Sequence, residues 1–79
     1  MTVKETLKLN QKTMELLQTK GNDKSAKVLK EHKMVFEYYE MEWERYIREN
    51  KEQNIAGLEL FAINKSNDLL IEMQKAVFN

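Results

Sequence analysis

Proline is absent from this sequence, and glycine occurs only at positions 21 and 57. Proline breaks helices because it lacks an amide hydrogen, and glycine weakens them because its backbone is so free. Good helix formers such as Leu, Glu, Lys, Gln and Met dominate the remaining composition. The sequence therefore predicts an all-α fold with few positions at which a helix must end.

Apolar side chains recur at helical spacing in three stretches of the chain. They predict helices over about 3–20, 23–50 and 55–78, the second of them roughly 40 Å long. Because the connections are short, neighbouring helices should run antiparallel. We therefore expect residues 1–79 to form a single helical domain, a three-helix up-down-up bundle with a long central helix.

Local signals mark the ends of the first two helices. Thr2 and Glu5 fit a capping box, in which each side chain accepts a hydrogen bond from the other residue's amide. Gly21 is expected to end the first helix because it tolerates a left-handed backbone. Asn22 or Asp23 is expected to cap the second helix by accepting from its free amides.

The break between the second and third helices is marked less clearly, since residues 50–54 could themselves continue a helix. At 100° per residue, the apolar stripe through Phe36 and the stripe through Leu69 differ by roughly a third of a turn. A straight rod would point the two stripes in different directions, whereas a turn lets both face one core. We therefore expect a turn within 50–54, with a single continuous rod as the alternative.

The second helix is unusually rich in aromatic residues. The segment 35–49 holds five of the seven aromatic residues in the chain. Of these, Phe36, Tyr39 and Trp43 share one helical face and are expected to point into the core.

Each helix also carries apolar residues outside its main stripe, at positions where charged residues are usual. A chain of this length has a thin core and contains no cysteine, so association with another chain is the route left for covering this surface. We therefore expect a homodimer or higher oligomer that also binds another protein. The predicted interface consists of Met34, Tyr38, Met41, Trp43, Arg45, Tyr46, Leu60, Ile71 and Phe78.

The length of the first helix points to the same region. Packed antiparallel, it covers the second helix only as far as about residue 41. The end of the second helix that carries Trp43 and Tyr46 should therefore form a groove, a dimer contact or both. Large aromatic residues are common at the energetic centres of interfaces.

No set of side chains indicates catalysis. The chain has one histidine, His32, no Glu-x-x-His motif and no glycine-rich phosphate loop. We therefore expect no enzyme activity, no cofactor, no metal site and no small-molecule ligand, with His32 in the core or at its boundary. Asn10 and Ser66 interrupt apolar stripes, either as polar residues tolerated at a wet boundary or as a buried polar layer that fixes helix register.

Charge is unevenly spread in a chain whose net charge is zero. Residues 1–33 carry a net charge of +4, residues 34–49 carry −3 and the remainder carries −1. A solvated lysine face is the preferred interpretation of the basic segment, so nucleic acid is an unlikely partner. The alternative is a nucleic-acid-associated regulator, whose contacts would be made by Lys4, Lys8, Lys12, Lys20 and Lys24.

The sequence favours a small cytoplasmic interaction protein. No apolar run approaches the roughly 20 residues needed to span a bilayer, so we expect no membrane partner. Lysine greatly outnumbers arginine and asparagine is plentiful, which is typical of an AT-rich bacterial or phage genome. The leading hypothesis is a non-enzymatic adaptor, inhibitor or regulator, and a structural subunit of a larger, phage-type assembly is a further alternative.

Overall fold

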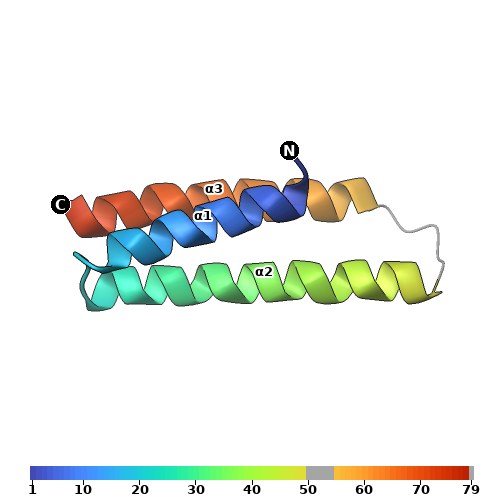
Figure 1. The fold of residues 1–79 in the computed structure, drawn as a ribbon, viewed down its shortest axis with the longest axis horizontal. Coiled ribbons are helices and arrows are strands. Elements are labelled where there is room, and N and C mark those ends of the chain that lie inside the picture. The colour runs from blue at the N-terminus through green and yellow to red at the C-terminus, as the bar shows by residue number, and fades with distance from the viewer. Residues whose placement is uncertain (50–54, 79) are drawn as a thin grey trace.

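The computed structural model describes residues 1–49 and 55–78, which form three α-helices and contain no strand (Figure 1). They are α1 (Val3–Gln18), α2 (Asp23–Glu49) and α3 (Ile55–Phe78). The predicted all-α fold is confirmed. The predicted turn lies outside the described residues, but α2 and α3 are separate helices lying side by side, which excludes the single rod.

The three helices pack against one another as an elongated bundle of 44 × 17 × 16 Å. Near one end, the Lys4 ammonium lies 3.3 Å from the Glu40 carboxylate. Near the other end, the Ser25 hydroxyl donates to Gln18 Oε1 over 2.7 Å. Residues later in α1 therefore contact residues earlier in α2. Figure 1 shows α1 packed against both longer helices.

The core consists of two apolar clusters. The first contains Met14, Leu29, Val35, Leu69 and Met73. The second contains Leu7, Phe36, Tyr39 and Ala62. Each cluster draws residues from all three helices, so the main apolar stripes meet as the helical spacing predicts.

Trp43 was expected to point into this core, and that prediction is wrong. Its side chain is 37% exposed, and Ile47, one turn further along α2, is 60% exposed. Phe36 and Tyr39 are buried as predicted. The difference arises because α1 begins at Val3, beside Glu40, and so leaves the rest of α2 uncovered on that side.

The turn between α1 and α2 corrects the role expected for Gly21. Its backbone is not left-handed, and α1 ends two residues earlier than predicted, with Thr19 as its C-cap. A Cβ at position 21 would meet Ser25 Oγ and would lie 2.7 Å from Gln18 Oε1. The turn therefore favours glycine, because a side chain at this position would displace the Ser25 hydroxyl and the Gln18 amide.

Two caps form as the sequence predicts. Thr2 and Glu5 make both hydrogen bonds of the capping box. At the start of α2 the cap is Asn22, whose side-chain oxygen accepts from the Ser25 amide over 2.9 Å. The Asn22 side-chain nitrogen also donates to the Ala76 carbonyl over 2.9 Å, which ties this turn to the last turn of α3. None of the described helices is both long and apolar enough to cross a membrane.

Candidate protein-interaction surface

The side of α2 that points away from the core carries a row of exposed apolar side chains. Met34 and Met41 are each 62% exposed, and Tyr38 is 50% exposed. Their spacing of four and then three residues places them on one face, nearly opposite the buried Phe36. Arg45 continues the row after another four residues, and its guanidinium lies 3.4 Å from the Glu49 carboxylate.

This row continues onto α3 through Phe61. The rings of Tyr38 and Phe61 meet edge to face, with centroids 6.2 Å apart and planes at 80°. Phe61 remains half exposed in spite of this contact. We call the surface formed by Met34, Tyr38, Met41 and Phe61 the α2–α3 patch.

Phe61 was missing from the predicted interface. It directly precedes the buried Ala62, so it lies at the edge of the stripe through which α3 faces the core. The sequence does not reveal which edge of that stripe is turned toward α2, and only the packing of the two helices brings Phe61 to Tyr38.

The predicted α3 residues lie elsewhere. Leu60 and Ile71 are exposed on the side of α3 that faces away from the core, and Phe78, also exposed, borders a pocket at the end of α1. Leu60 and Phe78 are separated by about 27 Å along the helix. Of the nine predicted interface residues, eight are exposed and Tyr46 is half-buried, but they do not form one continuous surface.

The aromatic end of α2 forms a ladder of three rings. Tyr39 and Trp43 are stacked, with centroids 6.4 Å apart and planes at 23°. Trp43 and Tyr46 are tilted at 31°, with centroids 5.9 Å apart. The ladder runs from the buried Tyr39 to the partly exposed end of α2, and Trp43 is its middle ring.

A pocket of about 300 Å³ opens beside this ladder. Its lining consists of Thr2, Val3, Lys4, Tyr39, Trp43 and Glu59. A hollow at this place is what the shortness of the first helix predicts. Burial, and then the negative charge of Glu59, raise the pKa of Tyr39 above its ordinary value, so its phenol stays protonated. The pocket combines apolar walls with one ammonium and one carboxylate, a lining suited to a large amphipathic side chain of a protein partner.

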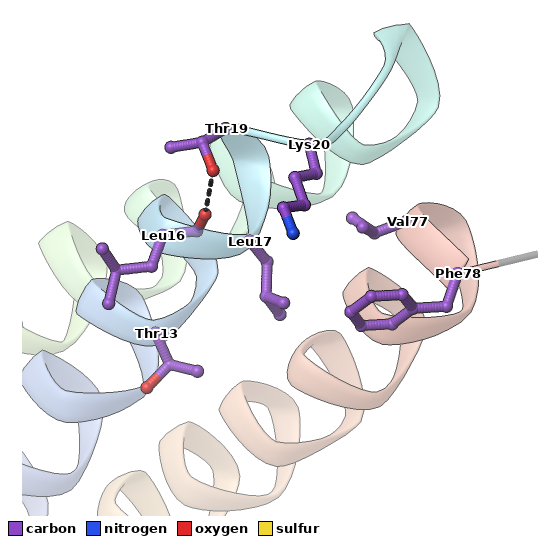
Figure 2. A pocket seen from close by; sticks show the side chains of 7 residues that line it. All are labelled: Thr13, Leu16, Leu17, Thr19, Lys20, Val77 and Phe78. Atoms are coloured by element: carbon purple, nitrogen blue, oxygen red, sulfur yellow. Dashed lines mark hydrogen bonds between the residues drawn. The ribbon is translucent and has the colours of Figure 1, made fainter.

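A second pocket, of about 250 Å³, lies at the opposite end of the bundle (Figure 2). It lies between the C-terminal parts of α1 and α3 and the residues that follow α1, and is lined by Thr13, Leu16, Leu17, Thr19, Lys20, Val77 and Phe78. Figure 2 shows Leu17 and Phe78 facing each other across it, while Thr19 donates to the Leu16 carbonyl over 2.7 Å. This pocket was not predicted from the sequence, because only the packing of α1 against α3 brings these residues together.

Between the two apolar clusters, the helices meet in a buried polar layer. The Asn10 side-chain nitrogen donates to Ser66 Oγ over 2.9 Å, and Ser66 Oγ lies 2.6 Å from His32 Nε2. On the other side of the ring, His32 Nδ1 lies 3.3 Å from Gln11 Oε1. An uncharged ring satisfies all these contacts if the Ser66 hydroxyl donates to Nε2 and Nδ1 donates to Gln11. Burial also lowers the pKa of His32, which favours the same uncharged form.

Of the two interpretations of Asn10 and Ser66, the structure therefore supports the buried polar layer. The pair of Ser66 and His32 resembles a nucleophile beside a base. Both side chains are fully buried, however, and Asn10 already donates to the same oxygen. A substrate has no path to Ser66 Oγ in this arrangement. Within the two described ranges, no three His, Asp or Glu residues are placed to hold a metal ion.

The lysines of the nucleic-acid alternative are all exposed but do not gather at one place. Lys4 lies beside Glu40, at the aromatic end of α2. Lys20 lies about 24 Å further along, beyond the other end of α1. Phosphate binding usually needs a concentrated basic patch, and this spread does not provide one.

Comparison of the chain with protein-family models, curated proteins and solved structures gave no match.

Proposed function

We propose that this chain is a non-enzymatic protein-interaction module, an adaptor, inhibitor or regulator that acts in the cytoplasm. In this proposal its helices form an up-down-up bundle that pairs as a homodimer through α2 and docks a protein partner beside Trp43. The observation that carries the proposal is the exposure of Met34, Tyr38 and Met41 on a helix face that charged residues usually occupy.

The composition of the α2–α3 patch suits binding. Contiguous exposed apolar surface is uncommon on proteins that act alone and often marks an interaction site. Methionine side chains adapt to the shape of a partner, and aromatic rings contribute large contact areas. Association would remove this surface from water, which is favourable by roughly 25 cal/mol for each Å² of apolar area.

The pocket beside Trp43 is the proposed site for the second protein. Trp43 and Tyr46 would supply most of the buried area, as tryptophan and tyrosine commonly do at the centres of interfaces. Around them, Glu42, Arg45 and Glu49 would act as rim charges, which influence the rate of encounter more than the affinity.

Sedimentation tests the self-association. The native chain should sediment as a dimer at tens of micromolar, and Met34→Lys and Met41→Lys should each shift it toward the monomer. Glu15→Lys, a change at an exposed position on α1, is the matched control and should leave the dimer intact. A compact native monomer that neither methionine substitution alters would contradict the proposal. Recovery only as a much larger complex would instead favour a structural subunit.

A pull-down with the native chain, Trp43→Ala and Tyr46→Ala tests the partner site. We expect both substitutions to reduce capture of the partner while circular dichroism and sedimentation remain those of the native dimer. Glu15→Lys again serves as the control. Capture that is lost with Met41→Lys and retained with Trp43→Ala would place the partner on the α2–α3 patch and contradict the proposed site.

A further inference from the structure

The charges of α2 are divided between its two halves. The segment 23–36 carries a net charge of +2, with His32 uncharged, and the segment 37–49 carries −3. The α2–α3 patch lies at the boundary, because Tyr38 is two residues past the midpoint of the helix. A helix face with an apolar centre between a basic half and an acidic half is complementary to a second copy of itself that runs in the opposite direction.

Two copies could align their α2 helices in parallel or antiparallel. A parallel two-fold pair would place every charge opposite its own equivalent, for example Lys27 opposite Lys27 of the second copy. An antiparallel pair would place the basic half of each helix opposite the acidic half of the other. Because opposite charges attract and like charges in register repel, the charge distribution favours the antiparallel pair.

We propose that two copies of this chain pair through the α2–α3 patch with their α2 helices antiparallel, around a two-fold axis beside Tyr38. The inference rests on the self-association proposed above and adds the partner surface and the orientation. Isologous contacts of this kind are the commonest in dimers, since the same surface is used twice.

The two-fold axis determines which side chains meet. Met34 of one copy lies opposite the region of Met41 of the other, because both are within four residues of Tyr38. The axis reverses the direction of α2 but leaves α3 on the same side in both copies. The edge-to-face pair of Tyr38 and Phe61 therefore meets its own equivalent, and four aromatic rings gather at the centre of the interface.

Charged residues flank this centre in complementary order. Glu31 and Arg45 are each seven residues from Tyr38, about 10 Å along the helix, so Glu31 of one copy lies opposite Arg45 of the other. Within one chain, Glu31 already lies 3.3 Å from Lys65, and Arg45 lies 3.4 Å from Glu49. The dimer would join these two ion pairs into a network of alternating sign on each side of the axis.

Like-charged approaches on one edge of α2 oppose this order, and one of them is Glu37, which lies one residue from the axis and meets its own equivalent. Lys30 and Arg48 lie on the edge of α2 away from α3, and they come near each other across the two copies. This edge is exposed to solvent, where salt screens such repulsion.

The available surface is large enough for a stable contact. The broad side of the bundle measures 44 × 17 Å. A standard interface buries about 800 Å² on each partner, so this pairing would use the whole of that side.

Site-directed crosslinking tests the orientation, and the chain is suited to it because it contains no cysteine. Each introduced cysteine is then the only thiol. We expect Tyr38→Cys to form a covalent dimer with a short thiol crosslinker. An equilibrated mixture of Glu31→Cys and Arg45→Cys should give at least tenfold more covalent dimer than either variant alone, because equivalent positions are about 21 Å apart along the helix in the antiparallel pair. Glu15→Cys, on α1, is the matched control and should stay uncrosslinked.

The outcomes separate the orientation from the self-association. Efficient crosslinking of Glu31→Cys with itself would show a parallel pair and overturn this inference, while the homodimer itself would stand. A dimer in which none of the α2 cysteines crosslinks, but Ile71→Cys does, would place the contact on the outer side of α3 and also overturn it. A native chain that sediments as a monomer would overturn both proposals. Because Tyr38 contacts Phe61 within the chain, the folding of the Tyr38→Cys variant is checked by circular dichroism before crosslinking is measured.

Discussion

The buried polar layer is satisfied by an uncharged histidine and disturbed by a charged one. A protonated His32 would donate from both ring nitrogens, so Ser66 Oγ would accept from His32 as well as from Asn10, and the Ser66 hydroxyl hydrogen would lose Nε2 as its acceptor. In the uncharged ring each donor has an acceptor. No buried side-chain nitrogen or oxygen in the described parts of the chain lacks a hydrogen-bond partner.

This layer predicts a pH-dependent stability. Burial lowers the pKa of His32 in the folded chain, whereas in the unfolded chain it titrates at about 6.5. Below that pH the unfolded chain binds a proton that the folded chain does not, so acid favours unfolding. The free energy of unfolding should be at its full value above about pH 6.5 and should decrease as the pH falls toward the lower pKa of the folded state.

Urea denaturation between about pH 5 and pH 7.5 measures this dependence. The His32→Gln variant should show a clearly smaller slope over the same interval, because glutamine does not titrate. Equal slopes in the two proteins would contradict the role assigned to His32.

The lack of space beside Gly21 gives a second prediction about a single residue. In Gly21→Ala the added methyl group would press against Ser25 Oγ and the Gln18 amide, which hydrogen-bond to each other across the turn. We expect the free energy of unfolding to fall by about 1 kcal/mol, the value of the one hydrogen bond that the methyl group would displace. The neighbouring Lys20→Ala, at an exposed position, should change it by less than about 0.5 kcal/mol. Calorimetry on both variants checks the difference, and equal melting temperatures would contradict the steric explanation.

At the scale of the elements, the difference in length between α1 and α2 determines where the bundle is open. α1 has 16 residues and α2 has 27. The end of α1 and the start of α2 are held together at the turn. The whole difference in length between the two helices therefore lies beside Trp43, where α1 begins. The pocket lined by Trp43 is a consequence of this difference and not of any single residue.

Asn22 joins all three elements, and its two roles can be separated. Asn22→Ser keeps a cap oxygen for α2 but loses the hydrogen bond to the Ala76 carbonyl of α3. We expect it to cost about 1 kcal/mol of unfolding free energy, the value of one hydrogen bond. Asn22→Ala loses the cap as well and should cost about 1 kcal/mol more. Chemical denaturation of the two variants gives the comparison, and a serine variant as stable as the native chain would show that the bond to α3 contributes nothing.

At the scale of the whole molecule, the proposed dimer would couple folding to concentration. A chain that folds as a dimer gains apparent stability with concentration, by about 1.4 kcal/mol per dimer for each tenfold increase. The melting temperature of the native chain should therefore rise steadily between low and high micromolar concentrations. Met41→Lys should melt at a temperature that does not depend on concentration. Scanning calorimetry at several concentrations decides this, and a constant native melting temperature would argue against the dimer.

Much of the fold could be predicted because it depends on neighbours in the chain. The capping box of Thr2 and Glu5 needs residues only three positions apart, and the buried stripes follow from the helical repeat. The exposure of Met34, Tyr38 and Met41 follows from the same repeat, since they lie opposite Phe36. The candidate surface was therefore largely visible in the sequence, although its function as an interface remains a prediction.

Only the tertiary structure decided which flanks of the helices meet. Phe61 joins Tyr38, and His32 joins Ser66, because α3 lies on one particular side of α2, and no local pattern encodes that side. Trp43 is exposed because α1 stops short of it, and Gly21 is favoured because the Ser25 and Gln18 side chains lie in the space beside it. The sequence by itself determined the helices, the N-terminal caps of α1 and α2 and the main apolar faces, since these arise from contacts within a few residues. The polar layer, the two pockets and the patch across two helices arise from contacts between residues about twenty or more positions apart, which only the packing of the bundle brings together.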